Sequence, residues 1–184
     1  MVRNFDDRPV PSEILERILA NGLRAPSAGF SQGWSFLVLA GAEETKRYWD
    51  AVLPLERRQS FQWAGLLRAP LVIVALSNKQ TYLERYAETD KGHKPEIHDW
   101  PTPYWHIDAA FAAMLMLLTA TDAGLGALFF SVADIPAFRA AFGVPGRLHP
   151  IGAIAVGYPL PDRRSSSLSR GKRPQAEVVH RGRW

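Results

Sequence analysis

The chain of 184 residues contains no cysteine. Disulfide bonds, thiolate metal sites and cysteine nucleophiles are therefore excluded, and any redox chemistry has to be carried by a bound cofactor. Long apolar runs are also absent, because the longest, residues 109–118, is much shorter than the roughly 20 residues that span a bilayer. The first residues, "MVRNFDDRPV", carry charges where a secretion signal is apolar. We therefore expect a cytoplasmic protein without a membrane partner.

Motifs of several enzyme classes are missing as well. The sequence has no GxxxxGK[ST] loop, no GxSxG elbow, no HExxH pair and no GxGxxG turn. The sequence therefore gives no motif that would indicate a nucleotide hydrolase, a serine hydrolase or a zinc peptidase. His93 and His98 lie near Asp90 and Asp99, but their spacing fits no regular ligand geometry. We predict no metal site.

The composition indicates an ordinary globular protein. Hydrophobic residues make up 47% and charged residues 22% of the chain, and its length suits a single domain over residues 1–184. The net charge is +4, and the excess of basic residues gathers near the C-terminal end. These residues are Arg163, Arg164, Arg170, Lys172, Arg173, Arg181 and Arg183, against Glu177 alone. Such a cluster can hold phosphate or simply face water, and no stacking platform or recognition motif favours nucleic acid.

The hydrophobic pattern predicts four strands with helices between them. A first helix is expected over "VPSEILERILANGLRAP", with Ser12 as its N-cap. Residues 104–123 are apolar around the whole circumference, which predicts a central buried helix. The other expected elements are strands at 35–40, 69–77, 125–131 and 151–159, and helices from 42, over 56–67 and after an N-cap at Asp134. This order indicates an α+β or mixed α/β domain with helices packed over one sheet.

Two features remain as candidates for binding. The turn "RAPSAGFSQGW" is rich in small residues, although "PSAG" alone is typical of an ordinary helix-to-strand loop. Arg170 and Lys172 are two residues apart, so in extended backbone their side chains point the same way and can hold one phosphate. A flexible basic tail explains that spacing equally well. Arg3 is a further basic residue, at the other end of the chain.

Several segments together resemble the FMN-dependent nitroreductase family. "VRNFDDRPVPSEILERIL" is similar to the opening of that family, and "RAPSAGFSQGWSFLVL" to its flavin-contacting turn and first strand. "GLGALFFSVAD" stands in the place of the second flavin segment, while "IGAIAVGYP" and "RGKRPQAEVVH" resemble the closing strand, the phosphate-binding pair and the tail. The resemblance covers nearly the whole chain and keeps the order of the segments.

The resemblance implies a fold, a cofactor and an assembly. The fold would be a three-layer α/β/α arrangement with a mixed, mainly antiparallel sheet of four to five strands. Two FMN molecules would lie in the interface of a homodimer with swapped terminal arms. The phosphate would be bound by Arg3, Arg170 and Lys172. The implied ring contacts are Pro26, Ser27, Ala28 and Gln32 in the turn of the partner subunit, and Phe129, Phe130 and Ser131 near the reactive face.

The implied activity is that of an oxidoreductase that alternates two substrates. NADH or NADPH would deliver hydride to flavin N5, and a nitroaromatic, a quinone or a similar conjugated acceptor would then be reduced. The flavin does the chemistry in this scheme, so no catalytic side chain is predicted. Two alternatives stay open, namely a dehalogenating or flavin-fragmenting enzyme of the same superfamily, and a protein that stores flavin without oxidising NAD(P)H. The aromatic residues at 100–105 either cover the substrate or anchor the central helix.

The sequence also departs from the family pattern. Phe30 stands where asparagine is common and Gly33 where proline is common. The arginine that usually precedes the position of Arg3 is absent from the sequence, which leaves two explanations open, a truncated start or a weaker hold on the phosphate. Gln62 is the suitable polar residue for the pyrimidine edge of the flavin within residues 61–64.

Overall fold

A computed structural model describes residues 1–91 and 100–184. His93, His98 and Asp99 lie outside the described residues, so the expectation that they form no metal site stays a prediction. Within the described part of the chain, no helix has the length and apolar character that crossing a membrane requires.

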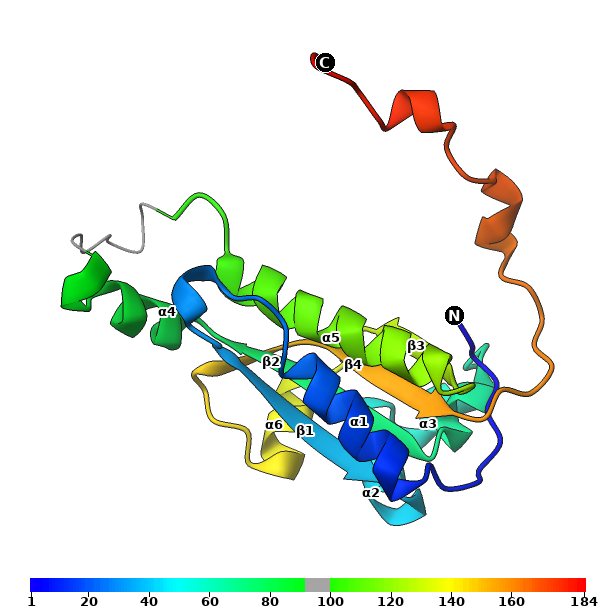
Figure 1. Cartoon of the computed structure of the whole chain (residues 1–184). Helices are drawn as coiled ribbons and strands as arrows, with labels where there is room; N and C mark the ends of the chain where they lie inside the picture. Colours follow the sequence, from blue (N-terminus) through cyan, green and yellow to red (C-terminus); the bar gives the residue numbers. More distant parts are fainter. Residues whose placement is uncertain (92–99) are drawn as a thin grey trace.

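The centre of the fold is a four-stranded sheet in the order β1-β2-β4-β3 (Figure 1). Its strands are β1 (Trp34–Ala40), β2 (Leu71–Asn78), β3 (Gly126–Phe130) and β4 (Leu148–Gly157). All three pairs of neighbouring strands are antiparallel, and no parallel pair occurs among the described residues. The four predicted strands are thus present, with β4 beginning a few residues earlier than expected, and the α+β class is confirmed.

Helices cover both faces of this sheet and make the three layers that were predicted. The helices α1 (Ser12–Gly22) and α5 (Tyr104–Asp122) lie on one face, and α2 (Ala42–Val52) and α6 (Ile135–Phe142) on the other (Figure 1). The side chains of β2 alternate between the two layers, because successive residues of a strand point to opposite faces. Leu71, Ile73 and Ala75 pack in the α5 layer, while Val72, Val74 and Leu76 pack in the α2 layer.

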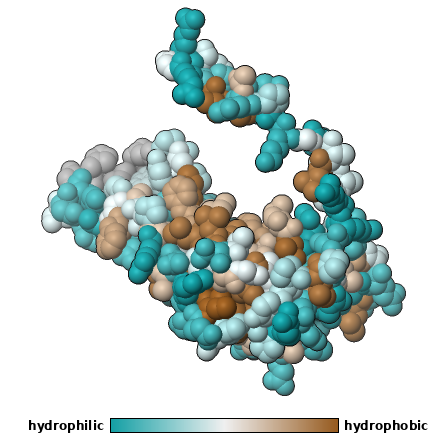
Figure 2. All heavy atoms as spheres, turned by 45° about the vertical axis from the view of Figure 1, so that its right-hand side comes forward, coloured by the Kyte–Doolittle hydropathy of each residue, from teal (hydrophilic) through white to brown (hydrophobic). Residues whose placement is uncertain are grey.

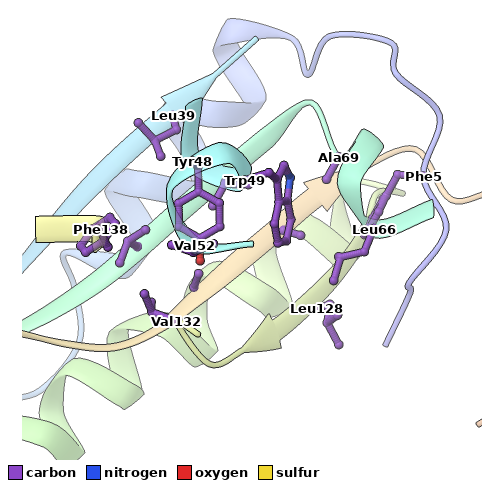
Figure 3. Packing of buried hydrophobic residues seen from close by; sticks show 14 of the residues in the cluster. Phe5, Leu39, Tyr48, Trp49, Val52, Leu66, Ala69, Leu128, Val132 and Phe138 are labelled. Atoms are coloured by element: carbon purple, nitrogen blue, oxygen red, sulfur yellow. The ribbon is translucent and has the colours of Figure 1, made fainter. Parts of the chain in front are cut away.

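Aromatic side chains dominate the core between the sheet and α2 (Figure 3). Tyr48 and Trp49 meet edge to face with ring centroids 5.0 Å apart, and Tyr48 meets Phe138 in the same way at 6.2 Å. Within the described structure, the Tyr48 hydroxyl and the Trp49 indole nitrogen are buried without a hydrogen-bond partner. Burial accordingly raises the pKa of Tyr48.

The remaining described elements are short. They are α3 (Leu55–Arg58), α4 (Lys79–Tyr86) and the 3-10 turns Ala28–Phe30, Ala64–Arg68, Thr89–Lys91, Ser166–Arg170 and Gln175–Glu177. The prediction of one helix over 56–67 is therefore wrong. The N-terminal segment crosses this stretch, where the Phe5 amide donates to the Gly65 carbonyl at 3.2 Å, so a tertiary contact replaces a helical bond. Ser12 is the first residue of α1 and Pro11 its N-cap, whereas Asp134 caps α6 as predicted by accepting from the Ala137 amide.

Helix α5 has the predicted position but is buried on one face only. Ala109, Ala112 and Met116 on that face are fully buried against the rest of the chain. The opposite face leaves Phe111, Met114 and Leu118 exposed by 47%, 53% and 59%, because the sheet covers a single side of the helix. Figure 2 shows hydrophobic surface along the upper edge of the body, facing the gap beneath the C-terminal tail.

The C-terminal tail leaves the body after β4. Its residues are almost all exposed from position 159 onward, and the chain extends away from the helices and the sheet (Figure 1). That residues 1–184 form one domain stays a prediction.

Candidate functional site

An aromatic cavity of about 360 Å³ lies between strand β3 and the α2 layer. It brings together Arg3, Phe129, Phe130 and Ser131, four residues predicted to contact a cofactor. The other residues that line it are Met1, Trp49, Val52, Leu53, Phe61, Trp63, Leu66, Leu128 and Ala133. A mostly apolar hollow of this size with a few polar groups at its rim is typical of a small-molecule site.

Strand β3 positions the two phenylalanines on opposite sides of the sheet. Phe130 points to the α2 layer and stacks on Trp49, with centroids 5.5 Å apart and planes 15° from parallel. Phe129 packs in the α5 layer, where its ring lies over Gly152 of β4. A Cβ atom at Gly152 would overlap this ring, so the glycine makes room for the predicted site residue. Sequence reasoning missed Gly152, although a glycine inside a strand often marks such a close approach.

Arg3 is held at the rim of the cavity by its backbone and by an aromatic neighbour. Its amide donates to Asp162 at 3.0 Å, and its guanidinium lies 4.8 Å from the centre of the Trp63 ring. The guanidinium of Arg163 lies 5.0 Å from the same ring and donates to the Gln62 carbonyl at 3.3 Å. Two cations thus share one indole. Sequence reasoning missed Trp63 and placed Arg163 only in the basic C-terminal cluster, not at this cavity. Gln62 does not line the cavity, whereas Phe61 and Trp63 do.

The predicted turn of Pro26, Ser27, Ala28 and Gln32 lies at the opposite edge of the sheet. This turn leads into β1, whereas Phe129 and Phe130 end β3, and β2 and β4 lie between these two edge strands. Three spacings of about 4.8 Å separate the edges, or roughly 14 Å. The two groups of predicted residues therefore belong to different regions of one chain.

The turn has an unusual backbone. Gly29, Phe30 and Gln32 have φ values of 62°, 57° and 51°, in the left-handed region. Asparagine tolerates this conformation far better than phenylalanine, so Phe30, one of the departures from the family pattern, occupies a strained position. Its side chain is 75% exposed, which leaves a large aromatic ring on the surface beside the turn.

The buried carboxylate of Asp108 in α5 holds the turn in place through hydrogen bonds. Asp108 of α5 is 3% exposed, and its Oδ2 accepts from the Ala28 amide and from the Tyr82 hydroxyl, both at 2.8 Å. Burial and the bond to Asp108 raise the pKa of Tyr82. Within the turn, the Gln32 amide donates to the Ser27 hydroxyl at 3.0 Å. Sequence reasoning missed Asp108, although a lone acid in the apolar run "HIDAAFAAM" is a signal for a buried polar contact.

Arg170 and Lys172 lie on the exposed tail, apart from Arg3 and from the turn (Figure 1). Arg170 ends a 3-10 turn, and Gly171 has a φ of 70°. The backbone at this pair therefore lacks the extended conformation in which the two side chains would point the same way, because Gly171 in the left-handed region turns the chain between them. Their predicted role in binding phosphate stays a prediction.

The fold and the cavity together indicate a three-layer α+β protein with a small-molecule site at the rim of its sheet. Residues 1–158 match the model of the Nitroreductase family, and the chain belongs to this family. The resemblance seen in the sequence is thus confirmed, and with it the expectation of an enzyme of the nitroreductase class.

Similar proteins carry several names. A 5,6-dimethylbenzimidazole synthase from Rhodospirillum rubrum is 28% identical over 182 residues, which cover 92% of this chain and 82% of that protein. An NADPH-dependent oxidoreductase from Staphylococcus aureus is 24% identical over 186 residues, which cover 100% and 70%. The solved structure of an FMN-dependent nitroreductase from Clostridium difficile R20291 matches with a TM-score of 0.70 at 23% identity, covering 100% and 94% of the chains. This last likeness supports the fold.

Replacing Gly152 by alanine tests the contact beneath Phe129. The added methyl group would overlap the ring, so the ring has to move, and overpacking of this kind costs about 1–3 kcal/mol of the free energy of unfolding. Urea unfolding measures this loss. Gly146→Ala is the matched control, because a Cβ there meets nothing within 4 Å. An equal effect of both changes would contradict the assigned contact.

Proposed function

We propose that this protein is an FMN-dependent NAD(P)H oxidoreductase that works as a homodimer and reduces flat conjugated acceptors such as nitroaromatics and quinones. The observation that carries the proposal is the division of the cofactor residues between two edges of the sheet. In one chain Ala28 and Phe129 belong to opposite edges of the sheet, roughly 14 Å apart across the strands, whereas two chains facing each other could place them against the same flavin ring.

The residues of the cavity fit a flavin. Its aromatic and aliphatic walls suit a flat ring system, and Arg3 at the rim supplies a positive charge for a phosphate. When bound, FMN supplies the means to take a hydride from a nicotinamide and pass electrons to an acceptor. Names of related proteins point the same way, since one is called FMN-dependent and another NADPH-dependent.

The chain itself would bind, orient and exclude water. Arg3, with Arg170 and Lys172 on the tail, would hold the phosphate through charge-assisted hydrogen bonds. The small side chains of Ser27 and Ala28 would let the backbone approach a ring closely. The Ala28 amide is already bonded to Asp108, so Ala28 would contact the ring by packing and not by donating a hydrogen bond.

The exposed face of α5 provides the surface for a second copy. Phe111, Met114 and Leu118 leave a large apolar area in contact with water. A second apolar hollow of about 460 Å³ lies along this helix and shares Met1 and Phe129 with the first. An interface on this face would therefore cover the apolar surface and adjoin the proposed flavin cavity. The exposed tail would reach the partner, as swapped terminal arms do.

Stopped-flow reduction tests the function directly. We expect the purified protein to be yellow and dimeric, and we expect NADH or NADPH to bleach the bound flavin in a first step. Mixing the reduced protein with a nitroaromatic or a quinone should restore the colour. A colourless monomer that takes up no FMN would overturn the proposal. If the protein binds flavin but neither nucleotide bleaches it, the result would support a flavin-storage protein instead.

The relative from Rhodospirillum rubrum favours a second candidate reaction. A 5,6-dimethylbenzimidazole synthase shares 28% identity with this chain, more than the NADPH-dependent oxidoreductase does. The same experiment separates the two candidates when oxygen is the acceptor. Recovery of intact FMN after reoxidation supports the oxidoreductase, whereas loss of the flavin with formation of 5,6-dimethylbenzimidazole supports the synthase.

A further inference from the structure

A second polar hollow lies away from the aromatic cavity, at the end of the sheet where β2 finishes and β4 begins. Its volume is about 300 Å³, and it is lined by Ser77, Lys79, Trp105, His106, Arg147 and His149. These residues come from β2, from the first turns of α4 and α5, from the segment before β4 and from β4 itself. Basic side chains from three separate parts of the fold, α4, α5 and the start of β4, therefore meet at one place.

An irregularity in the sheet turns His149 toward this hollow. Ala75 pairs with Gly152 but Leu76 pairs with Pro150, so Ile151 is an extra residue on β4 and forms a β-bulge. Beyond the bulge, His149 lies directly opposite Ser77, on the face of the sheet that α5 covers. If Ile151 were regularly paired instead of bulging, alternation along the strand would place His149 on the α2 face.

The two histidines and the serine form a connected group. The His106 and His149 rings have centroids 5.3 Å apart, and Ser77 Oγ lies 2.8 Å from His106 Nδ1. The Ser77 hydroxyl also donates to the His149 carbonyl, at 3.3 Å. A hydroxyl has one proton, so His106 Nδ1 donates to Ser77 when this proton points to the carbonyl, and accepts from Ser77 in the other tautomer. His106 Nε2 then has no partner among the described residues.

The hollow carries positive charge that the described part of the chain does not balance. Lys79 lies 5.0 Å from the centre of the Trp105 ring, and Arg147 is exposed. Within residues 1–91 and 100–184, no carboxylate forms an ion pair with Lys79, Arg147 or either histidine. Burial and the nearby His149 lower the pKa of His106, as expected where cationic groups crowd together. An anion bound here would remove this repulsion.

We propose that this hollow binds a small oxyanion such as phosphate, held by Lys79, Arg147 and the pair His106 and His149. The nature of the side chains selects an anion, because a lysine and an arginine repel a metal ion, and the described residues contain no cluster of three metal-binding side chains. Protonated His106 would donate from Nε2, and the positive end of the α5 dipole beside it would add to the attraction. The site is separate from the proposed flavin cavity, with which it shares no lining residue.

Nuclear magnetic resonance of the histidine rings tests this site. The flavin-loaded protein is titrated with acid, with and without inorganic phosphate, at an ionic strength kept constant with sodium chloride. His106→Gln and His149→Gln identify the two signals, and His180 on the tail is an internal control. We expect phosphate to raise the pKa of His106 by about 1, as a nearby opposite charge does, to shift the ring signals of His149, and to leave the ring signals of His180 unchanged.

Two paired variants show whether the hollow causes the effect. Lys79→Ala combined with Arg147→Ala should abolish the rise, whereas Arg181→Ala combined with Arg183→Ala, which removes the same charge from the tail, should not. Adenosine monophosphate distinguishes the source of the ligand, since equal shifts at lower concentrations would identify a phosphomonoester and support the site. Equal shifts with sodium chloride alone, or shifts that persist without Lys79 and Arg147, would overturn the proposal.

The pH dependence of stability gives a second readout. The lowered pKa of His106 means that the unfolded chain binds protons first as the pH falls, so the folded protein loses stability below about pH 6.5. Lys79, Arg147 and His149 are the described charged or titratable groups that line the hollow with this ring. Phosphate should reduce the loss, because it favours the protonated ring in the folded state. An unchanged profile in phosphate would count against the site.

Discussion

Replacing Asp108 by alanine should destabilise the protein more than any other single change considered for this chain. The substitution removes the oxygen that accepts from the Ala28 amide and from the buried Tyr82 hydroxyl. Each buried donor left without a partner costs about 1–3 kcal/mol, so we expect a loss of about 3 kcal/mol or more in the free energy of unfolding. Urea unfolding at one protein concentration measures this loss as a lower midpoint at an unchanged slope.

Two further variants at acidic positions separate the hydrogen bonds from the charge. In Asp108→Asn the amide oxygen can still accept from both donors, so the loss should be well below that of Asp108→Ala. Asp122→Ala removes a carboxylate from the same helix that is 81% exposed and 3.6 Å from Arg17, and it should cost less than about 0.5 kcal/mol. If Asp108→Ala were as stable as Asp122→Ala, the two buried bonds would not hold the turn.

Removing Arg170 and Lys172 together should release the flavin from the protein. Under the proposed function both side chains bind its phosphate, and a hydrogen bond to a charged group contributes about 1.5–3 kcal/mol. Because both residues are exposed in the single chain, screening by water reduces this value, and we expect the Kd for FMN to rise about 10-fold to 100-fold. Quenching of FMN fluorescence measures the change.

The tail itself offers a matched control for this variant. Arg181→Ala combined with Arg183→Ala removes the same charge from the same segment, a few residues further on. If both double variants weakened FMN equally, the tail would act through its overall charge and not through a bound phosphate. The free energy of unfolding should not change in either variant without flavin, because these side chains are exposed.

The sequence predicted the sheet and its two covering layers well, because local pattern and tertiary packing agree there. The strand "APLVIVALS" is buried on both faces, and its unbroken apolar run with three β-branched residues predicts this burial. The prediction of a helix over 56–67 was wrong because the structure of this stretch depends on a contact with a distant segment, the residues around Phe5. Helix α5 was expected to be buried all round, and the single chain covers only one of its faces.

The candidate site was predictable only where residues act through their own type and neighbours. Arg3, Phe129 and Phe130 could be named from motifs, and the structure brings them to one cavity. Gly152, Trp63 and Asp108 were missed, since the partner of each lies far away in the chain, although a glycine in a strand and an acid in an apolar run are signals for the first and the last. The spacing of Arg170 and Lys172 did not indicate the backbone between them, where Gly171 has a positive φ, and their role in binding phosphate stays a prediction.

The bulge at Ile151 makes the second site depend on how the two strands pair. Regular pairing of this one residue with β2 would leave every basic side chain of the hollow in the sequence and would keep its charge and composition. It would nevertheless shift the register by one residue and turn His149 to the other layer of the fold. A search for this site in related chains should therefore compare how the residues between His149 and Gly152 pair with β2 as well as their identity.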